Sequence, residues 1–412
     1  MERLVSVLGL AVLVGIAVLF STNRRRIDWR LVGAGLTLQI AFAAIVHLFP
    51  PGQRALEWIR DAAVTLLSFT EDGSRFLFGP LMEADGPVGF VFAFRVLPVI
   101  VFFSSLMGVL YHLGIMQRLV LLLARGMKRI MGVSGSESLS VAANVFIGQT
   151  EAPLVVRPYI ARMTRAELMV LMTGGMATIA GSVLAGYIAF GVDAGHLLAA
   201  SVMSAPAALV MARILIPETE TSLTKGGVEI QDERDTVNVI DAAADGASQG
   251  LKLALNVGAM LLAFIALVAL VNALLGWVAS WMVSFGLTAW PGSLQEIFGY
   301  VLWPVAWSLG VPAADCFTFA GLLGQKLAIN EFVAFAELGR LVAEGAMSER
   351  AITIATYSLC GFANFSSISI QIGGIGALAP NRRHDLSRLG LRAMLGGALA
   401  SSMTAAIAGI ML

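Results

Sequence analysis

Long apolar stretches alternate with short polar segments along this chain. The apolar stretches cover residues 4–21, 31–49, 88–116, 167–190, 197–216, 251–283, 351–378 and 389–412. A helix needs about 20 residues to cross the hydrocarbon core of a bilayer. Each stretch is about that long or longer, so the pattern predicts eight transmembrane helices.

Two further apolar segments, at residues 134–163 and 311–345, are interrupted by polar residues near their centres. The apolar flanks on either side of each interruption are too short to span a bilayer. Each segment is therefore predicted to be a re-entrant hairpin that enters the membrane, turns and leaves on the same side. A polar tip at membrane depth is tolerated only where protein or a wet cavity surrounds it, so both tips are candidate binding sites.

The remaining segments set the orientation. Residues 54–72 and 118–131 are amphipathic and are predicted to lie as interfacial helices on the outer and cytoplasmic faces. Arginines at 24–26 and 382–383 follow apolar stretches, and loops rich in arginine stay in the cytoplasm. The acidic segment 217–248 is predicted to be a flexible cytoplasmic linker.

The two halves of the chain repeat one order: interfacial helix, hairpin, interrupted helix and final helix. Glu151 at the first hairpin tip precedes Gly175-Met176-Ala177-Thr178, and Glu331 at the second precedes Gly361-Phe362-Ala363-Asn364. The first hairpin is predicted to enter from the cytoplasm and the second from outside, which makes them opposed and the repeats inverted. Inverted repeats with interrupted helices are typical of secondary transporters, although a channel remains an alternative.

The predicted fold is an all-α integral membrane protein with eight transmembrane helices, two opposed re-entrant hairpins, interfacial helices and inverted repeats. Its expected parts are 1–115 (N-terminal spans, mainly scaffold), 116–216 (first inverted repeat with its hairpin), 217–248 (cytoplasmic acidic loop), 249–291 (scaffold span) and 292–412 (second inverted repeat with its hairpin).

Composition agrees with a membrane protein. The 412 residues are 58% hydrophobic and 13% charged, with a mean hydropathy of +0.83, whereas soluble domains carry about 25% charged residues. The net charge is zero, so nothing points to a nucleic-acid partner. Cys316 and Cys360 lie in apolar segments and are expected to be inert thiols. No nucleophile–base pair stands out, so we do not expect an enzyme.

The polar residues of the two hairpins and the second interrupted helix suit a neutral polar solute. Side-chain amides both donate and accept hydrogen bonds, as a heterocyclic base requires, and carboxylates accept from the vicinal hydroxyls of a sugar. The residues of this candidate site are Gln149, Thr150, Glu151, Asn330, Glu331, Asn364, Ser366 and Ser367.

Structural interpretations remain open for several of these positions. Glu151 or Glu331 could form an ion pair with Arg157 or Lys326 instead of binding a solute. Asn144 and Thr178 lie in small-residue segments, where hydrogen bonds between packed helices are common.

Three motifs resemble the signature stretches of the concentrative nucleoside transporter family, in its short bacterial, sodium-coupled type. They are Gly148-Gln149-Thr150-Glu151-Ala152-Pro153, Asn330-Glu331-Phe332-Val333-Ala334 and Gly361-Phe362-Ala363-Asn364-Phe365-Ser366-Ser367. The resemblance implies a homotrimer in the lipid bilayer of the bacterial inner (plasma) membrane. It also implies nucleoside import by sodium symport, with elevator-like alternating access. A proton-coupled nucleoside symporter and a passive channel for polar solutes remain alternatives.

The resemblance also assigns residues. Those expected at the nucleobase are Gln149, Thr150, Glu151 and Val183. Those expected at the ribose are Glu331, Asn364 and Ser367, with Phe362 packing beside it. Those expected at the sodium ion, partly through backbone carbonyls, are Asn144, Ile147, Thr178 and Ile179. Thr178 stands where the family pattern has serine, and it keeps the hydroxyl. The resemblance leaves open a preference for purines or pyrimidines and the ion stoichiometry.

Overall fold

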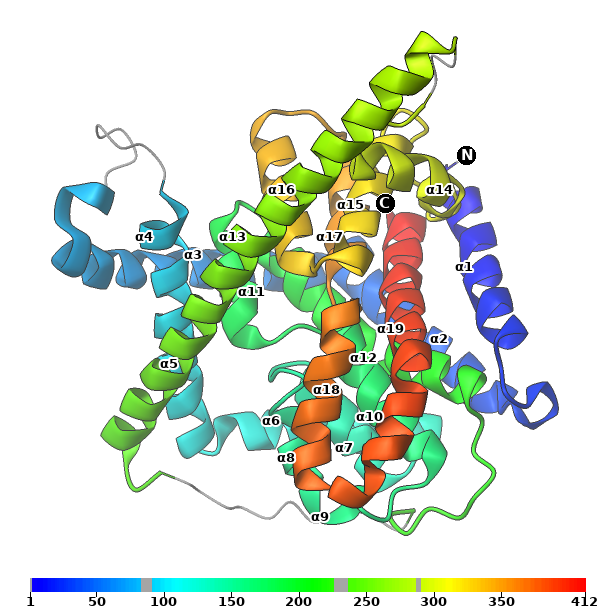
Figure 1. Cartoon of the computed structure of the whole chain (residues 1–412). Helices are drawn as coiled ribbons and strands as arrows, with labels where there is room; N and C mark the ends of the chain where they lie inside the picture. Colours follow the sequence, from blue (N-terminus) through cyan, green and yellow to red (C-terminus); the bar gives the residue numbers. More distant parts are fainter. Residues whose placement is uncertain (1, 83–90, 226–235, 287–289) are drawn as a thin grey trace.

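The structure, a computed structural model, describes residues 2–82, 91–225, 236–286 and 290–412. Within these residues the regular elements are all helices, which confirms the predicted all-α class (Figure 1). The start of the stretch predicted over 88–116 and the middle of the linker predicted over 217–248 lie outside the described residues.

Seven helical segments within the described residues are long and apolar enough to cross a membrane. They are Glu2–Leu19, Trp29–Leu48, Phe92–His112, Arg165–Ala189, Ala194–Leu215, Val239–Ser284 and Pro380–Met411. The eighth predicted span, over 351–378, is divided into two shorter helices, Glu349–Leu359 and Phe365–Leu378. The count of eight spans therefore stays a prediction.

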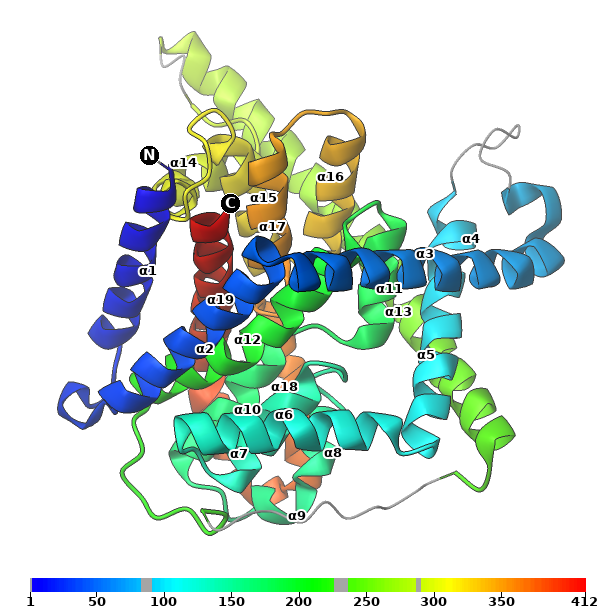
Figure 2. The same cartoon turned by 180° about the vertical axis from the view of Figure 1, so that it is seen from behind.

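The N-terminal helices surround one side of the molecule. They are α1 (Glu2–Leu19), η1 (Arg24–Arg26), α2 (Trp29–Leu48), α3 (Pro50–Phe78) and η2 (Gly79–Met82). The side chain of Asp28 accepts hydrogen bonds from the backbone N–H groups of Arg30 and Leu31 and so begins α2. Amphipathic α3 lies across the bundle at a steep angle to the neighbouring helices (Figure 2).

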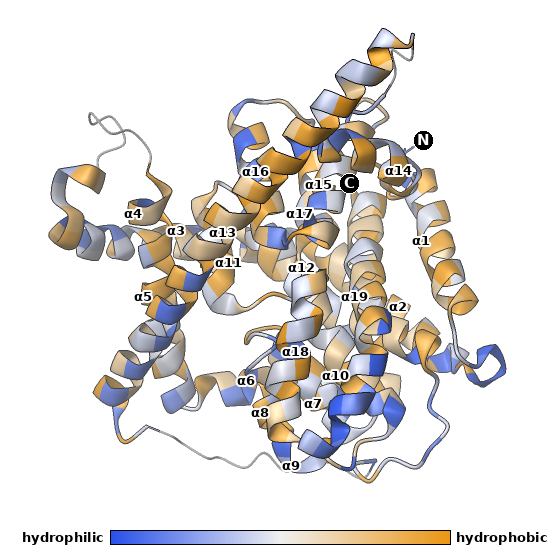
Figure 3. Ribbon diagram, viewed as in Figure 1, coloured by the Kyte–Doolittle hydropathy of each residue, from blue (hydrophilic) through white to orange (hydrophobic). Residues whose placement is uncertain are grey.

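Two long apolar helices pair at the periphery: α5 (Leu97–His112), preceded by α4 (Phe92–Arg95), and α13 (Val239–Ser284). Glycines allow this close approach, because a Cβ at Gly108 would stand 2.6 Å from the carbonyl oxygen of Ala242. Only 17% of the 18-residue apolar stretch of α13 is buried inside the protein. Figure 3 shows hydrophobic residues along this helix, as expected of a helix that is long and apolar enough to cross a membrane.

The structure corrects the extent of the linker predicted over 217–248, because α13 already begins at Val239. Asn238 caps this helix by accepting a hydrogen bond from the N–H of Asp241. Acidic side chains in a first turn also interact favourably with the helix dipole. Two of the acidic residues of the predicted linker, Asp241 and Asp245, thus lie in the first turns of a long helix.

The first predicted hairpin follows an amphipathic helix, as expected. The elements of this part are α6 (Ile115–Met131), α7 (Gly135–Asn144), α8 (Ala152–Val155), α9 (Arg157–Ile160), α10 (Arg165–Ala177), α11 (Gly181–Ala189) and α12 (Ala194–Leu215). The chain is non-helical over 145–151, between α7 and α8, and this turn contains the polar tip.

The second half of the chain is also helical in the residues that the structure describes. It contains α14 (Leu294–Ser308), α15 (Cys316–Ala328), α16 (Glu331–Ala343), α17 (Glu349–Leu359), α18 (Phe365–Leu378), η3 (Pro380–Arg382) and α19 (Arg383–Met411). In Figure 1, α7 to α9 lie toward the bottom of the molecule and α15 and α16 toward the top. The core lies between them: α10, α12 and α19 pack together, and 83% of the apolar window of α12 is buried.

The two interrupted helices touch where each is unwound. The backbone N–H of Phe362, between α17 and α18, donates to the carbonyl oxygen of Thr178, between α10 and α11, over 3.3 Å. Gly361 has a φ of +144°, and a Cβ there would stand 2.8 Å from the carbonyl oxygen of Ala177. Only glycine combines this backbone conformation with so close an approach.

We expect Gly361→Ala to lower the apparent melting temperature of the purified protein by several degrees. The left-handed conformation alone costs a non-glycine residue about 1–3 kcal/mol, and the methyl group would also push the two segments apart. Thermal unfolding in detergent measures the effect.

Gly373→Ala in α18 is the matched control for this substitution. A Cβ there meets no atom within 4 Å, and alanine is the better helix former. If both variants melt at the wild-type temperature, the packing of the two unwound segments against each other does not depend on glycine at position 361.

Candidate functional site

Two helices, α16 and α18, each start with an asparagine cap. Helix α16 begins at the predicted tip of the second hairpin, and α18 begins after the non-helical residues that separate it from α17. Asn330 accepts a hydrogen bond from the N–H of Val333 at the start of α16. Asn364 accepts one from the N–H of Ser367 over 2.9 Å at the start of α18. These caps place Glu331 in the first turn of α16, where the helix dipole favours a carboxylate.

A chain of hydrogen bonds joins both predicted hairpins and both interrupted helices. Glu331 accepts at Oε1 from the hydroxyl of Tyr187 (3.3 Å) and at Oε2 from Nδ2 of Asn364 (2.9 Å). Asn364 is bonded to the backbone of Ser367, whose Oγ accepts from Nε2 of Gln149 over 3.1 Å. We call this set, completed by Gln371, the central polar network. Its members are Tyr187, Glu331, Asn364, Ser367, Gln149 and Gln371.

The structure brings some of the predicted substrate residues together and leaves others apart. Those in the central polar network are Gln149, Glu331, Asn364 and Ser367, all buried. Val183 is buried on α11, one turn before Tyr187. Phe362 is partly buried in the non-helical segment between α17 and α18. Thr150 and Glu151 are exposed and take no part in the network.

Two members of the central polar network, Tyr187 and Gln371, were not predicted from the sequence. Both are recoverable from helical spacing. Tyr187 lies four residues after Val183 on α11, and Gln371 lies four residues after Ser367 on α18. Residues four apart share a helix face, so each lies on the face of a predicted site residue.

Lys326 was a candidate ion-pair partner of Glu331, and the structure gives its ammonium group other partners. The side chain is fully buried. Nζ donates to the carbonyl oxygen of Ser358 and to Oγ of Ser401, both over 2.8 Å. Lys326 therefore anchors the end of α17 through Ser358 and contacts α19 through Ser401.

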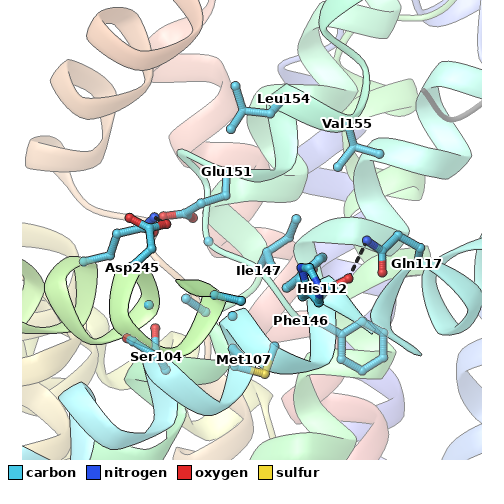
Figure 4. A pocket seen from close by; sticks show the side chains of 18 of the residues that line it. Ser104, Met107, His112, Gln117, Phe146, Ile147, Glu151, Leu154, Val155 and Asp245 are labelled. Atoms are coloured by element: carbon cyan, nitrogen blue, oxygen red, sulfur yellow. Dashed lines mark hydrogen bonds between the residues drawn. The ribbon is translucent and has the colours of Figure 1, made fainter. Parts of the chain in front are cut away.

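A cavity of about 780 Å³ lies between the tip of the first hairpin and the α5–α13 pair. Glu151 and Ile147 line it from the hairpin, Ser104 and Tyr111 from α5, and Asp245 from α13. In Figure 4 the side chains of Glu151 and Asp245 point toward each other across the cavity. Sites for small organic molecules measure about 300–1,000 Å³, so this space is large enough for a nucleoside.

The residues predicted to bind sodium lie in two places. Asn144 and Ile147 lie at the end of α7 and in the turn that follows it, and Thr178 and Ile179 lie between α10 and α11. Oδ1 of Asn144 is buried and has no hydrogen-bond partner, while Nδ2 donates to the carbonyl oxygen of Ser140. The hydroxyl of Thr178 donates to the carbonyl oxygen of Gly174 and keeps its lone pairs. Hard cations prefer such oxygen ligands, so Asn144 and Thr178 fit a sodium ion. Ile147 and Ile179 would contribute backbone carbonyls.

Comparisons with known proteins identify the family. The model of the Na⁺-dependent nucleoside transporter N-terminus matches residues 8–81, and that of the C-terminus matches residues 196–409. A model described as "Nucleoside recognition" matches residues 93–194. These matches cover most of the chain.

Relatives and solved structures agree with the family models. An uncharacterized transporter of Haemophilus influenzae is 47% identical, and the alignment covers all of this chain and 98% of that protein. Sodium/nucleoside cotransporter 1 of Rattus norvegicus is 45% identical, and this chain spans 64% of its length.

Among solved structures, CNTnw in an inward-facing substrate-bound state is 45% identical, with a TM-score of 0.92 over 100% of this chain and 98% of that one. A variant of CNTnw in the intermediate 2 state is 44% identical, with a TM-score of 0.94 over 100% and 99% of the two chains. This chain therefore belongs to the Na⁺-dependent nucleoside transporter family, a family of transporters rather than enzymes, with sodium as its coupling ion.

Proposed function

We propose that this protein imports nucleosides across a bacterial inner membrane by sodium symport with elevator-like alternating access. The observation that carries the proposal is the central polar network, which joins the two hairpins and the two interrupted helices. The cavity of nucleoside size is lined by Gly148 and Glu151, which lie on either side of Gln149 and Thr150 in the first turn, and not by the members of the network. Donors and acceptors at the meeting point of discontinuous helices are how secondary transporters hold polar substrates.

In this proposal the network divides the substrate between two groups of residues. Glu331, Asn364 and Ser367 hold the ribose, since a carboxylate accepts from vicinal hydroxyls and the Ser367 hydroxyl still has a proton to donate. Gln149 binds the nucleobase, with Thr150, Glu151 and Val183 completing its contacts. Phe362 packs beside the sugar.

Sodium would couple to substrate through the first hairpin turn. The proposed ligands Asn144 and Ile147 precede Gln149 in the same turn, and Thr178 and Ile179 belong to the break beside it. The carbonyl oxygen of Phe146 accepts from the N–H of Gly181 over 2.9 Å, so the turn and the break are held together. An ion between them would fix Gln149 in the position that binds the base.

The proposed moving unit contains the two re-entrant hairpins and the two interrupted helices, which form inverted repeats. The proposed scaffold contains α5, α13 and part of the N-terminal spans. Two observations support this division: the cavity lies between the hairpin tip and the α5–α13 pair, and α13 is largely exposed. The apolar surface of α13 would face lipid and the other subunits of a homotrimer.

Proteoliposomes that contain the purified protein should accumulate radiolabelled uridine above equilibrium when an inward sodium gradient is present. A proton gradient alone should drive little uptake. Equal uptake under either gradient would refute the sodium assignment, and equilibration without accumulation would indicate a passive channel.

Thr178→Val should raise the sodium concentration for half-maximal uptake roughly tenfold, which corresponds to about 1.4 kcal/mol, because valine keeps the shape and loses the oxygen. Thr173→Val is the matched control, since the Thr173 hydroxyl is equally buried on α10 and has no hydrogen-bond partner. Equal sodium dependence in the two variants would exclude Thr178 as a ligand.

Glu331→Ala should lower the ratio of maximal uptake rate to KM by roughly 100-fold or more. It removes a charged acceptor that serves two protein donors, and each such bond contributes about 1.5–3 kcal/mol. Glu337→Ala on the same helix, where the side chain pairs with Arg340 at the surface, should leave uptake unchanged. Normal uptake by Glu331→Ala, with normal membrane insertion, would contradict a ribose role.

A further inference from the structure

Helices α3 and α6 both lie across the bundle, at different levels, and α5 runs between those levels (Figure 2). The two helices differ in charge. The arginines of α3 share that helix with four acidic residues, Glu57, Asp61, Glu71 and Asp72. The charged residues of α6 are all basic, and they are Arg118, Arg125, Lys128 and Arg129. Helix α6 therefore carries a strong positive charge, whereas α3 does not.

One face of α6 is packed against the rest of the protein. Its buried residues are Met116, Val120, Ala124, Met127 and Met131. These positions recur every three to five residues, so they form a single stripe along the helix. The other side chains of α6 are available to whatever surrounds the protein.

The exposed side of α6 is divided into two stripes. The basic stripe contains Arg118, Arg125 and Arg129, which are exposed and are spaced by seven and four residues. The apolar stripe contains Ile115, Leu119 and Leu122, which are 41%, 42% and 67% exposed. Leu122 lies four residues after Arg118 and three before Arg125, so the two stripes are neighbours. An apolar stripe beside a basic one is typical of a helix in the plane of a membrane interface.

The protein does not neutralise the basic stripe. Among the residues that the structure describes, no carboxylate lies within ion-pair distance of any basic side chain of α6. On α3, by contrast, Arg75 lies 3.9 Å from Glu71. The guanidinium groups of α6 are therefore free to bind anions from outside the protein.

The position of α6 in the chain gives such binding a structural effect. Only Gly132 and Val133 separate the end of α6 from Ser134. Ser134 caps α7, the first helix of the predicted hairpin, by accepting a hydrogen bond from the N–H of Glu137. At its other end, α6 follows α5 after the short turn at Gly114. A ligand that holds α6 in place therefore braces α5 against the first hairpin.

We propose that the basic stripe of α6 binds the headgroups of anionic phospholipids, while the apolar stripe lies among their acyl chains. Guanidinium groups pair with phosphate oxygens through two parallel hydrogen bonds. Clusters of basic residues on an amphipathic helix attract anionic lipids in this way. The match of charge with charge and of apolar surface with acyl chains selects a lipid over a soluble anion. This inference does not depend on the proposed function.

The test compares two lipids with the same acyl chains, added to the full-length protein in an uncharged detergent. Dioleoyl-phosphatidylglycerol is anionic, and dioleoyl-phosphatidylcholine has a phosphate but no net charge. Native mass spectrometry counts the bound lipids, and thermal unfolding measures the bracing of α6. The wild-type protein should retain more phosphatidylglycerol and melt several degrees higher with it than with phosphatidylcholine.

The triple variant Arg118→Gln, Arg125→Gln and Arg129→Gln should lower the amount of bound phosphatidylglycerol roughly threefold or more. It should also lose at least half of the gain in melting temperature. Its melting temperature with phosphatidylcholine should equal that of the wild-type protein, because the three side chains are exposed and make no ion pair. A triple variant that keeps the wild-type preference for phosphatidylglycerol would refute the proposal.

The matched control is the triple variant Arg54→Gln, Arg60→Gln and Arg75→Gln, which removes three exposed arginines from α3. It should keep the wild-type preference, and an equal loss in this variant would show that the lipid does not choose α6. Inorganic phosphate in place of phosphatidylglycerol should not raise the melting temperature, since it has no acyl chains. A gain as large as that from the lipid would identify a site for a soluble anion instead.

A second measurement uses the wild-type protein alone and serves if the triple variant is not recovered folded. Choline chloride, added at a fixed sodium concentration, raises the ionic strength from about 0.1 M to about 1 M and shortens the screening length from about 10 Å to about 3 Å. The difference in melting temperature between the two lipids should then shrink. An unchanged difference, or no difference at low salt, would refute the proposal. No arm uses a nucleoside, so failure here leaves the proposed transport function untouched.

Discussion

The structure depends on one constraint: backbone polar groups that leave a helix inside an apolar interior must find partners within the protein. The two interrupted helices supply partners to each other, because the backbone N–H of Phe362 donates to the carbonyl oxygen of Thr178. That contact needs Gly361, since any side chain there would strike α10. Once the two breaks are joined, the helix starts that carry the polar side chains converge on the same point.

The convergence sorts the polar atoms into two groups. Some atoms hold the protein together: the Oδ1 of Asn364 caps α18, and the Nδ2 of Asn364 holds Glu331. Others are left over, such as the Oδ1 of Asn144 and the exposed carboxylate of Glu151. A transporter must bind its cargo and then release it, and the second group can contact a ligand directly. In the proposed function Glu331 and Asn364 also contact the ligand, with the hydrogen-bonding capacity that their bonds within the protein leave unused.

The sequence predicts the helical class, the non-helical turn over 145–151 and four members of the central polar network, because polar groups in apolar segments are conspicuous. It does not separate Thr150 from Gln149, although one is exposed and the other buried, since a turn reverses direction within one residue. Tyr187 and Gln371 escape notice because their partners come from other helices. The start of α13 was misplaced because a charged segment suits a linker and a solvated helix end equally well.

The fully buried ammonium group of Lys326 has a consequence for how the chain is made. Its two partners, Ser358 and Ser401, come 32 and 75 residues later in the sequence. Until both have been synthesised, α15 carries an unpaired charge that the bilayer interior disfavours by several kcal/mol. Both hydrogen-bond partners of Lys326 are therefore present only after α19 has been made, so this buried contact is completed late in synthesis.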